Sequence, residues 1–349
     1  MNVIWILPGF ASNESDSTCI PPLQDLALSL QQQKVNLTIL ALDYPFEQKS
    51  YCWNGIRVYA VGGANKKRFS RMLLLLRAWR LLISLINNHG VDIIHSFWLT
   101  WPAILGQQFC KKYKLPHLQT IMGQDAMKNK FYRLFDFKYS TIVNLTQFAN
   151  ERFYSAISQQ SDEIIPFGLG QVFEEVVDRD IDLINVGSVT GLKNQMFFLK
   201  LVYQIHQIKP NIKAVIIGKF YDMHLIKEMK QFIVEKDLES NISLLNELPR
   251  VEIFKFMRRS KVMAHTSAFE SQGMVMLEAI AHGCKVYSSG KGIHFNHELY
   301  SLLTDDLKEN VNSIVSYLIK KEYPYGEKLI SIEQTANCYL ELYKKLSKK

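Results

Sequence analysis

The feature that most constrains the fold is an alternation of short β-branched runs with amphipathic stretches. One series begins at Val3–Leu7, and a second, similar series begins at residues 182–186. Strands that alternate with helices favour a parallel α/β architecture. Because the alternation stops near residues 167–180 and then restarts, the sequence predicts two Rossmann-like domains of similar size.

These two series set the expected domain boundaries. We expect a first domain over residues 1–170, a second over 171–325, and a C-terminal helical segment over 326–349 that packs back toward the first domain. A length of 349 residues suits two domains of ordinary size. Ligands of such sheets bind beyond the carboxyl ends of the strands, so the parallel sheets are expected to face an interdomain cleft that holds the ligand.

The individual elements follow from the same pattern. In the first domain the predicted strands cover 3–7, 35–42, 92–95, 117–121, 141–144 and 163–165, with helices over 22–32, 65–88 and 102–112. In the second domain the predicted strands cover 182–186, 214–217, 242–245, 262–265 and 285–288. Helices are expected over 196–208, from 274 to about 282, and near 306–320 and 332–346.

Composition excludes several classes of protein. Hydrophobic residues make up 48% and charged residues 21%, which is typical of a folded globular chain. No run of 18 apolar residues occurs, and the N-terminus lacks a basic region and a cleavage site, so neither a membrane span nor a signal peptide is expected. The five cysteines are scattered without a CxxC or Cys/His cluster, which indicates no disulfide framework, no zinc site and a reducing cytosol.

Charge is unevenly distributed along the chain. The net charge is +8, and residues 1–170 hold 17 Lys and Arg against 11 Asp and Glu. No acidic residue lies between Glu47 and Asp92, and the segment 65–88 interleaves apolar residues with Lys66, Lys67, Arg68, Arg71, Arg77 and Arg80. A basic amphipathic helix of this kind binds anionic membrane surfaces, so contact through Lys66–Arg80 is expected. The alternative is a core helix with a basic outer face; nucleic acid is not expected, because no recognition motif is present.

The most informative stretch surrounds two glutamates, Glu270 and Glu278. Glu270 precedes a predicted helix, Glu278 lies on it, and Gly273 between them allows a ligand to approach the backbone closely. The free N–H groups of the first helical turn favour a phosphate. Each carboxylate can accept two hydrogen bonds from a vicinal diol. A nucleotide sugar, with a sugar at each end of a diphosphate, suits this arrangement.

This stretch resembles the E-x7-E signature of retaining glycosyltransferases of the GT-B fold, specifically glycosyltransferase family 4. Other parts of that family's pattern occur in the same order, so that the resemblance covers most of the chain. In the second domain, residues 185–194 resemble the family's G-R-x4-K loop and residues 214–218 resemble its next strand. Residues 164–168 resemble the hinge motif I-P-N-G. In the first domain, residues 92–95 resemble the D-V-V-H strand and residues 121–125 resemble the H-G-x-D segment.

The resemblance implies a role for each matching residue. Glu270 and Lys193 are the implied catalytic pair, with Glu270 holding hydroxyls of the transferred sugar and Lys193 neutralising the departing diphosphate. The implied donor-binding residues are Glu278 at the ribose, the backbone near Gly273, Met274 and Val275, the loop residues Gly187 and Ser188, and the Gly9 loop at the donor phosphate and acceptor. The family's reaction implies no protein nucleophile, no metal and no cofactor besides the donor substrate.

The sequence also departs from the family pattern. Ser188 stands in place of an arginine, Met122 in place of a histidine, and Phe97 and Phe167 replace a second histidine and an asparagine. Two candidates therefore remain for the acceptor or sugar side, His95 and Asp125. The alternatives are a hydrogen-bonded structural histidine and an aspartate that caps the following helix.

These observations predict a retaining hexosyltransferase-type enzyme that moves a sugar from a nucleotide sugar to a glycan or lipid-linked acceptor. We expect a role in cell-surface polysaccharide or glycolipid synthesis, in the cytoplasm on the inner face of the membrane. The alternatives are an inactive GT-B relative that acts as a binding protein, and a nucleotide-sugar epimerase. The D-x-D spacing at 178–182 is interpreted as a solvated turn rather than as a metal site.

Overall fold

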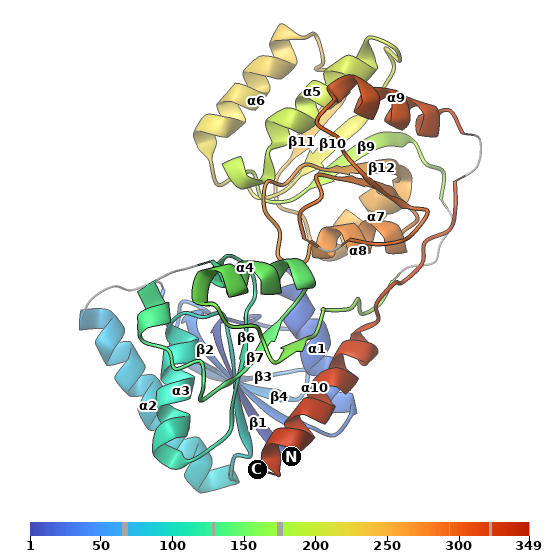
Figure 1. Cartoon of the computed structure of the whole chain (residues 1–349). Helices are drawn as coiled ribbons and strands as arrows, with labels where there is room; N and C mark the ends of the chain where they lie inside the picture. The colour runs from blue at the N-terminus through green and yellow to red at the C-terminus, as the bar shows by residue number, and fades with distance from the viewer. Residues whose placement is uncertain (65–68, 128–129, 173–176, 293, 321–322, 349) are drawn as a thin grey trace. The chain divides into compact units, whose positions relative to one another are not determined.

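The chain forms two compact units, each built around its own sheet (Figure 1). The computed structural model describes residues 1–64, 69–127, 130–172, 177–292, 294–320 and 323–348. Unit 1 consists of Met1–Gly170 together with Ile330–Lys349, and unit 2 of Gln171–Leu329. Helices cover the sheet of each unit, which confirms the predicted pair of parallel α/β domains.

Unit 1 contains an eight-stranded sheet in the order β3-β4-β2-β1-β5-β6-β7-β8. Its strands are β1 (Asn2–Gly9), β2 (Asn36–Tyr44), β3 (Lys49–Trp53), β4 (Ile56–Ala60), β5 (Ile93–Phe97), β6 (His117–Thr120), β7 (Thr141–Asn144) and β8 (Glu163–Ile164). Every neighbouring pair is parallel except β3 and β4. The carboxyl ends of β1 and β5 therefore lie at the same edge of the sheet.

The edge hairpin of β3 and β4 was not among the predicted strands. Asn54 and Gly55 join the two strands with φ angles of 46° and 84°. Two consecutive residues in the left-handed region suit a tight hairpin turn, and Asn-Gly is the dipeptide that most favours it. The sequence thus contained a signal for this hairpin, between two short runs rich in aromatic and β-branched residues.

Five helices cover the two faces of this sheet. They are α1 (Pro21–Gln32), α2 (Phe69–His89), α3 (Trp101–Tyr113), α4 (Gln147–Ile157) and α10 (Ile332–Ser347), with short 3-10 turns η1 (Gln124–Ala126) and η2 (Lys130–Arg133). Side chains of α2 and α3 pack with Ile4 and Ile6 of β1 in one cluster, because alternate residues of a strand face the same side. On α2 the buried residues Leu74, Ala78, Leu82 and Leu85 recur at helical spacing, and each buried leucine stabilises the fold by roughly 1.5–3 kcal/mol.

The C-terminal helix α10 belongs to unit 1. Ser331 caps it with a capping box that includes Gln334. Just before α10, the chain passes beside residues 168–169, and Leu169 N donates to Ile330 O (2.9 Å). A Cβ on Gly168 would lie 2.1 Å from Ser331 O, so this close crossing requires glycine. The helix then contacts α1 and β5.

Unit 2 contains a six-stranded sheet in which every neighbouring pair is parallel, in the order β11-β10-β9-β12-β13-β14. Its strands are β9 (Ile181–Val186), β10 (Ala214–Ile217), β11 (Ile242–Leu245), β12 (Ser260–His265), β13 (Lys285–Ser288) and β14 (Tyr300–Leu302). Numbered within the unit, the order is 3-2-1-4-5-6, that of the dinucleotide-binding fold. The strand order reverses between β9 and β12, and such a switch point is where ligands bind in these sheets.

The helices of unit 2 divide between its two faces. They are α5 (Gln195–His206), α6 (Met223–Glu235), α7 (Arg250–Arg259), α8 (Met274–Ala281) and α9 (Leu307–Leu318), with a short turn η3 (Gly191–Lys193). Side chains of α5, α6 and α9 share one core cluster, and those of α7 and α8 share another on the opposite face (Figure 1). None of the described helices of either unit has the length and apolar character required to cross a bilayer.

Candidate functional site

The predicted site residues of unit 2 gather at its switch point. The loop after β9 carries Gly187, Ser188 and Lys193, and the loop after β12 carries Glu270 and Gly273. Two hydrogen bonds join these loops: Ala268 N donates to Leu192 O (2.7 Å) and Thr266 Oγ1 donates to Lys193 O (2.9 Å). The two loops therefore form one connected structure at the carboxyl edge of the sheet.

Close backbone packing shapes the loop after β9. Gly187 has a φ of +156°, and a Cβ on Gly218 would lie 1.9 Å from the Gly187 carbonyl oxygen. The fully buried Gln195 donates through its amide nitrogen to the carbonyls of Gly187 (3.4 Å) and Ser188 (3.1 Å). Gln195 was not predicted, but it holds the loop in place from the first turn of α5.

Glu270 receives three donors on one carboxylate oxygen, Oε1. The Lys193 ammonium contacts this oxygen directly, Ser267 Oγ lies 3.1 Å away and His265 Nε2 lies 3.3 Å away. Within the described residues, all of the side-chain contacts of Glu270 fall on Oε1. The other oxygen, Oε2, is thus the acceptor that remains for a bound hydroxyl.

The surroundings of Glu270 keep its carboxylate ionised. Burial raises its pKa, but the hydrogen bond from His265 and the charge of Lys193 outweigh this effect and lower the pKa to about 2. Its side chain is 14% exposed and that of Lys193 is 27% exposed, so both are reached from solvent. A fixed anion beside a fixed cation can hold a polar ligand that carries both hydroxyls and phosphate.

His265 and Ser267 were not predicted as site residues from the sequence. Both are buried at the carboxyl end of β12, and His265 Nδ1 has no hydrogen-bond partner in the described part of the chain. The sequence signal that could have identified His265 was its position at the end of a predicted strand, shortly before Glu270. Its function emerges only when the strand places Nε2 beside the carboxylate.

The N-terminus of α8 supplies backbone donors next to Glu270. Gly273 is the N-cap with a φ of +83°, and within the described residues it has no side-chain cap hydrogen bond. The first-turn N–H groups, including those of Met274 and Val275, lack helical acceptors, and the helix dipole favours an anion there. The helix ends at Ala281 and Gly283 follows with a φ of +72°, as predicted for a residue just beyond a helix C-terminus.

Glu278 forms a separate ion pair with Arg250, the first residue of α7. Nε and Nη2 of Arg250 both lie 3.0 Å from Glu278 Oε1. The two side chains are 14% and 16% exposed, so solvent reaches this pair as well. Arg250 was not predicted as a partner of Glu278, because the two residues are 28 positions apart and lie on different helices. The two glutamates are thus held by different cations.

Gly9 ends β1 at the carboxyl edge of the unit 1 sheet. A Cβ at this position would lie 3.1 Å from Tyr44 Cβ, and Phe10 N donates to Tyr44 O (3.1 Å). The loop that follows is fixed by Asp16, which accepts from Ser12 N (2.9 Å) and Tyr44 Oη (2.8 Å). The Gly9 loop is therefore an ordered part of unit 1.

His95 is fully buried in unit 1, and both of its ring nitrogens bond within the fold. Nδ1 lies 2.6 Å from Tyr343 Oη and Nε2 lies 2.8 Å from Thr120 Oγ1. Burial lowers its pKa well below the usual value. Of the two interpretations of His95, this geometry favours the hydrogen-bonded structural histidine, which joins β5 to α10.

Asp125 is also buried, and its carboxylate binds backbone rather than solvent. It accepts from the N–H groups of Leu99 (2.8 Å), Met122 (3.1 Å) and Gly123 (2.6 Å). Burial raises its pKa, although these hydrogen bonds act against the increase. Asp125 therefore holds together the loops that follow β5 and β6, and any influence on a ligand passes through those loops.

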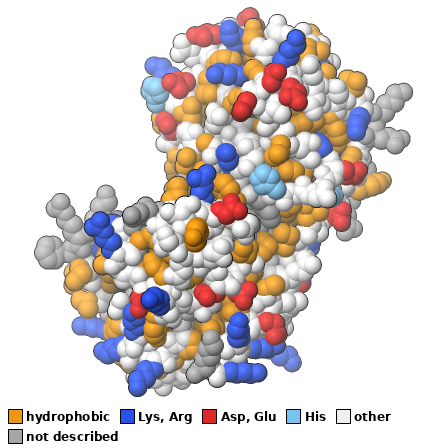
Figure 2. Space-filling model, in the orientation of Figure 1, with side chains coloured by type: hydrophobic (Ala, Val, Ile, Leu, Met, Phe, Trp, Pro, Cys, Tyr) orange, Lys and Arg blue, Asp and Glu red, His pale blue; other side chains and the backbone are white. Residues whose placement is uncertain are grey.

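The predicted basic helix is described from Phe69 onward, so Lys66, Lys67 and Arg68 lie outside the described residues. Arg71 is buried and pairs with Asp43 Oδ1 (2.8 Å), so the expectation that it contacts a membrane is corrected. The remaining basic residues of the segment, Arg77 and Arg80, are exposed. Large exposed apolar side chains accompany them on the first turns of α2: Met72, Leu73 and Leu76. Figure 2 shows orange and blue side chains together over α2.

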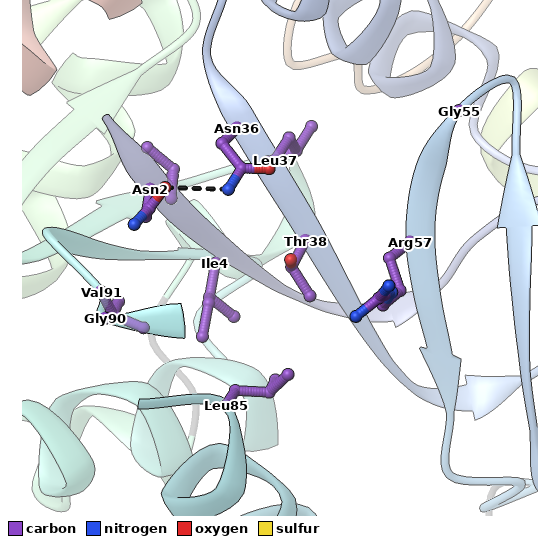
Figure 3. Close-up of a pocket in the computed structure, with 11 residues that line it drawn as sticks. Asn2, Ile4, Asn36, Leu37, Thr38, Gly55, Arg57, Leu85, Gly90 and Val91 are labelled. Atoms are coloured by element: carbon purple, nitrogen blue, oxygen red, sulfur yellow. Dashed lines mark hydrogen bonds between the residues drawn. The ribbon is translucent and has the colours of Figure 1, made fainter. Parts of the chain in front are cut away.

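A cavity of about 250 Å³ lies at the amino ends of strands in the unit 1 sheet, opposite to the edge at which Gly9 lies (Figure 3). Its lining includes Asn2, Asn36, Thr38 and Arg57, and Asn36 Nδ2 donates to Asn2 Oδ1 (2.8 Å). These residues come from the first part of their strands, whereas ligands of parallel sheets bind at the carboxyl ends. This cavity therefore lies apart from the Gly9 loop.

Two of the acidic residues at 178–182 form ion pairs. Asp180 pairs with Arg259 (2.6 Å), and the buried Asp182 pairs with Lys261 (2.8 Å). Asp182 thus belongs to β9 and not to a solvated turn. No group of three His, Cys, Asp or Glu side chains suited to a metal ion occurs in the described ranges.

Two family models match the chain. The model Glycosyl transferases group 1 matches residues 172–294, and the model Glycosyltransferase Family 4 matches residues 23–165. A relative described as the uncharacterized glycosyltransferase MJ1178 of Methanocaldococcus jannaschii is 26% identical over 222 residues, which cover 62% of this chain. The match spans 60% of the length of that relative.

Solved structures share the fold over nearly the whole chain. Anabaena Alr3699/HepE, in a crystal structure with UDP and glucose, has a TM-score of 0.69 and 14% identity, covering 100% of this chain and 97% of that one. Sucrose-phosphate synthase (tll1590) of Thermosynechococcus elongatus has a TM-score of 0.77 and 14% identity, covering 99% of both chains. At this identity the likeness concerns the fold.

Proposed function

We propose that this chain is a glycosyltransferase of the GT-B fold that transfers a sugar from a nucleotide sugar to a glycan or lipid-linked acceptor with retention of anomeric configuration. The observation that carries the proposal is the contact of Glu270 with Lys193 beside the uncapped N-terminus of α8. The solved structure of HepE with UDP and glucose supports the choice of donor class.

In this proposal the diphosphate of the donor lies between Lys193 and the first turn of α8. Lys193 supplies a full positive charge, and the N–H groups of Met274 and Val275 supply oriented dipoles. Both stabilise the negative charge that develops as the diphosphate leaves, and preorganised groups of this kind are the main source of electrostatic catalysis. Gly187 and Ser188 form the adjacent wall of the phosphate site.

The two glutamates bind the two sugars of the donor. Glu270 accepts from hydroxyls of the transferred sugar through Oε2, since Lys193, His265 and Ser267 all contact Oε1. Glu278 accepts from the ribose diol, while Arg250 holds its carboxylate in place. The resemblance to family 4 supports a metal-independent reaction without a protein nucleophile, in which positioning and charge stabilisation do the work.

The exposed face of α2 is proposed to contact an anionic bilayer, which would place the enzyme at the cytoplasmic face of a membrane. Met72, Leu73 and Leu76 supply apolar contact, and Arg77 and Arg80 supply charge. Each basic residue near such a surface contributes about 1 kcal/mol. Access to lipid-linked acceptors would follow, in keeping with cell-surface polysaccharide or glycolipid synthesis.

The donor proposal is tested with purified protein and a panel of UDP-, ADP- and GDP-sugars. We expect at least one nucleotide sugar to raise the unfolding temperature, because a ligand that binds only the folded state stabilises it. The same donor should be hydrolysed slowly, and Glu270→Gln should lower this rate about 100-fold or more. Glu239→Gln, at an exposed residue of the same unit, is the matched control. A panel without any stabilising nucleotide, or a Glu270→Gln variant equal to the control, contradicts the proposal.

The membrane proposal is tested separately by co-sedimentation with phosphatidylcholine vesicles, with and without phosphatidylglycerol. Wild-type protein should sediment with the anionic vesicles only. Arg77→Glu together with Arg80→Glu should release it, whereas Arg133→Glu together with Lys138→Glu, an equal change of charge at exposed residues outside α2, should not. Release by the control variant as well would show that net charge alone decides binding and would refute contact through α2.

A further inference from the structure

A second cavity lies in unit 2, between β13, β14 and α9. It has a volume of about 430 Å³ and is lined by Lys285, Tyr287, Glu298, Leu299, Ser301, Ser313, Ser316, Tyr317, Lys320 and Pro324. We call it the Lys285 cavity. Lys285 is the first residue of β13, so the cavity is placed toward the amino end of that strand, whereas Gly273 and Glu270 follow the carboxyl end of β12.

Lys285 is a buried cation whose ammonium bonds to backbone oxygens. It is only 8% exposed, and among the described residues no carboxylate forms an ion pair with it. Its ammonium donates to two carbonyl oxygens, those of Glu298 and Tyr300. An ammonium group has three N–H donors, so at least one remains for another acceptor. Burial of a charge without a counter-charge is costly and is rare in folded proteins.

A second cation makes this arrangement still less favourable. Lys320 lines the same cavity, and its ammonium lies 4.8 Å from the centre of the Tyr317 ring. Burial lowers the pKa of Lys285 and the charge of Lys320 lowers it further, while the charge of Glu298 acts in the opposite direction. Glu298 is the acidic residue among the described lining residues, and its side chain is exposed at the rim. The recessed part of the cavity is therefore positively charged.

Hydroxyl groups complete the lining. Ser313, Ser316 and Tyr317 share one face of α9, because residues three and four apart lie on the same side of a helix. Tyr317 is 7% exposed, and its hydroxyl has no hydrogen-bond partner within the described ranges. Ser301 approaches from β14. Ser316 donates its hydroxyl to Asn312 O (2.8 Å), which leaves the hydroxyls of Tyr317 and Ser301 as donors. Hydroxyl donors beside two ammonium groups are a combination that binds phosphate oxygens.

We propose that the Lys285 cavity binds the phosphate group of a small soluble phosphate ester. A bound phosphate would supply a counter-charge for both lysines and accept from the remaining N–H of Lys285. The volume lies within the range of small-molecule sites, so the cavity leaves room for an organic part beside the phosphate. The site does not depend on the proposed glycosyl transfer, because none of its lining residues belongs to the donor site.

Inorganic phosphate is the first probe, titrated by calorimetry at constant ionic strength with sodium chloride as the balancing salt. We expect binding to wild-type protein that weakens at least ten-fold in Lys320→Gln and is abolished in Lys285→Met. Lys308→Gln removes an exposed charge from α9 outside the cavity and should leave affinity unchanged. Lys320 is exposed, so its variant keeps the test decisive even if Lys285→Met fails to fold.

Two further measurements distinguish phosphate binding in the Lys285 cavity from phosphate binding elsewhere. Lys193→Ala should retain binding; loss of binding there, with retention in Lys320→Gln, would assign the phosphate to the donor site and overturn the proposal. Glycerol 3-phosphate should bind at least as tightly as phosphate, and glycerol should not bind. Binding to phosphatidic acid vesicles without binding to either soluble phosphate would also overturn it, as would the absence of any binding to wild-type protein.

Discussion

The Lys193 ammonium contacts the Glu270 carboxylate across 77 residues of sequence. The contact forms because the loops after β9 and β12 meet at the point where the strand order of unit 2 reverses. Lys193 follows the first strand of the unit and Glu270 the fourth, and parallel strands bring both loops to one edge. This pair anchors most of the predictions that follow.

His265 is expected to support the function of Glu270 without contacting the ligand. His265→Ala removes the hydrogen bond at 3.3 Å, and loss of one hydrogen bond to a charged group, about 1.5 kcal/mol, should lower kcat/KM about ten-fold. His265→Gln, which retains an N–H donor, should recover part of this loss. Donor hydrolysis measures both variants; equal activity of His265→Ala and wild type would show that the contact is dispensable.

Glu270 should make stability depend on pH in the acid range. Its pKa is about 2 in the folded chain against 4.5 for an ordinary glutamate, so its stabilising contribution is complete above pH 4.5 and is lost as pH falls toward 2. The contribution is at most about 3 kcal/mol by linkage. Urea unfolding at pH 7, 5, 4 and 3 should show the difference between wild type and Glu270→Gln shrinking below pH 4.5. A difference that stays constant with pH would refute the depressed pKa.

Tyr343 is expected to hold α10 on the sheet of unit 1. Its hydroxyl accepts from Trp5 Nε1 (3.0 Å) and lies 2.6 Å from His95 Nδ1, deep in the core. Tyr343→Phe leaves two buried polar atoms without this partner and should lower the free energy of unfolding by about 1–3 kcal/mol. Tyr325→Phe, at a side chain that is 80% exposed, should have no effect. Chemical denaturation compares the two, and an equal effect of both would contradict the assignment.

Gly218 is expected to be essential for the shape of the phosphate loop. Gly218→Ala places a methyl group 1.9 Å from the Gly187 carbonyl, so the loop that carries Ser188 and Lys193 must shift. We expect nucleotide binding to weaken at least ten-fold and stability to fall. Gly191→Ala, where a Cβ meets nothing within 4 Å, is the matched control in the same loop region. Calorimetry with the nucleotide identified in the panel tests both variants, and normal binding by Gly218→Ala would refute this account.

Several features were predictable because they depend on local chemistry. The two α/β series follow from residue patterns, and the start of α8 next to Gly273 and its end before Gly283 follow from the backbone freedom of glycine. The hairpin at Asn54 was overlooked although its turn residues are among the clearest local signals.

Other features had no local signal. Arg71 belongs to a basic segment by sequence, but burial and pairing with Asp43 separate it from the exposed Arg77. His95 lies in β5, a strand that resembles a site strand, yet Tyr343, 248 residues away, occupies one of its nitrogens. Such partners cannot be inferred from spacing, because the fold alone decides which distant side chain comes within hydrogen-bond distance.

The sequence by itself determined the alternation of strands and helices, the glycines at tight positions, and the presence of Glu270, Glu278 and Lys193 in a recognisable order. These properties depend on the backbone preferences and periodicity of neighbouring residues. Only the tertiary structure decided which oxygen of Glu270 is occupied, which cation holds Glu278, and that Lys285 is buried with its ammonium on backbone oxygens. Each of these depends on atoms from separate strands and helices, and packing of the whole unit sets their distances.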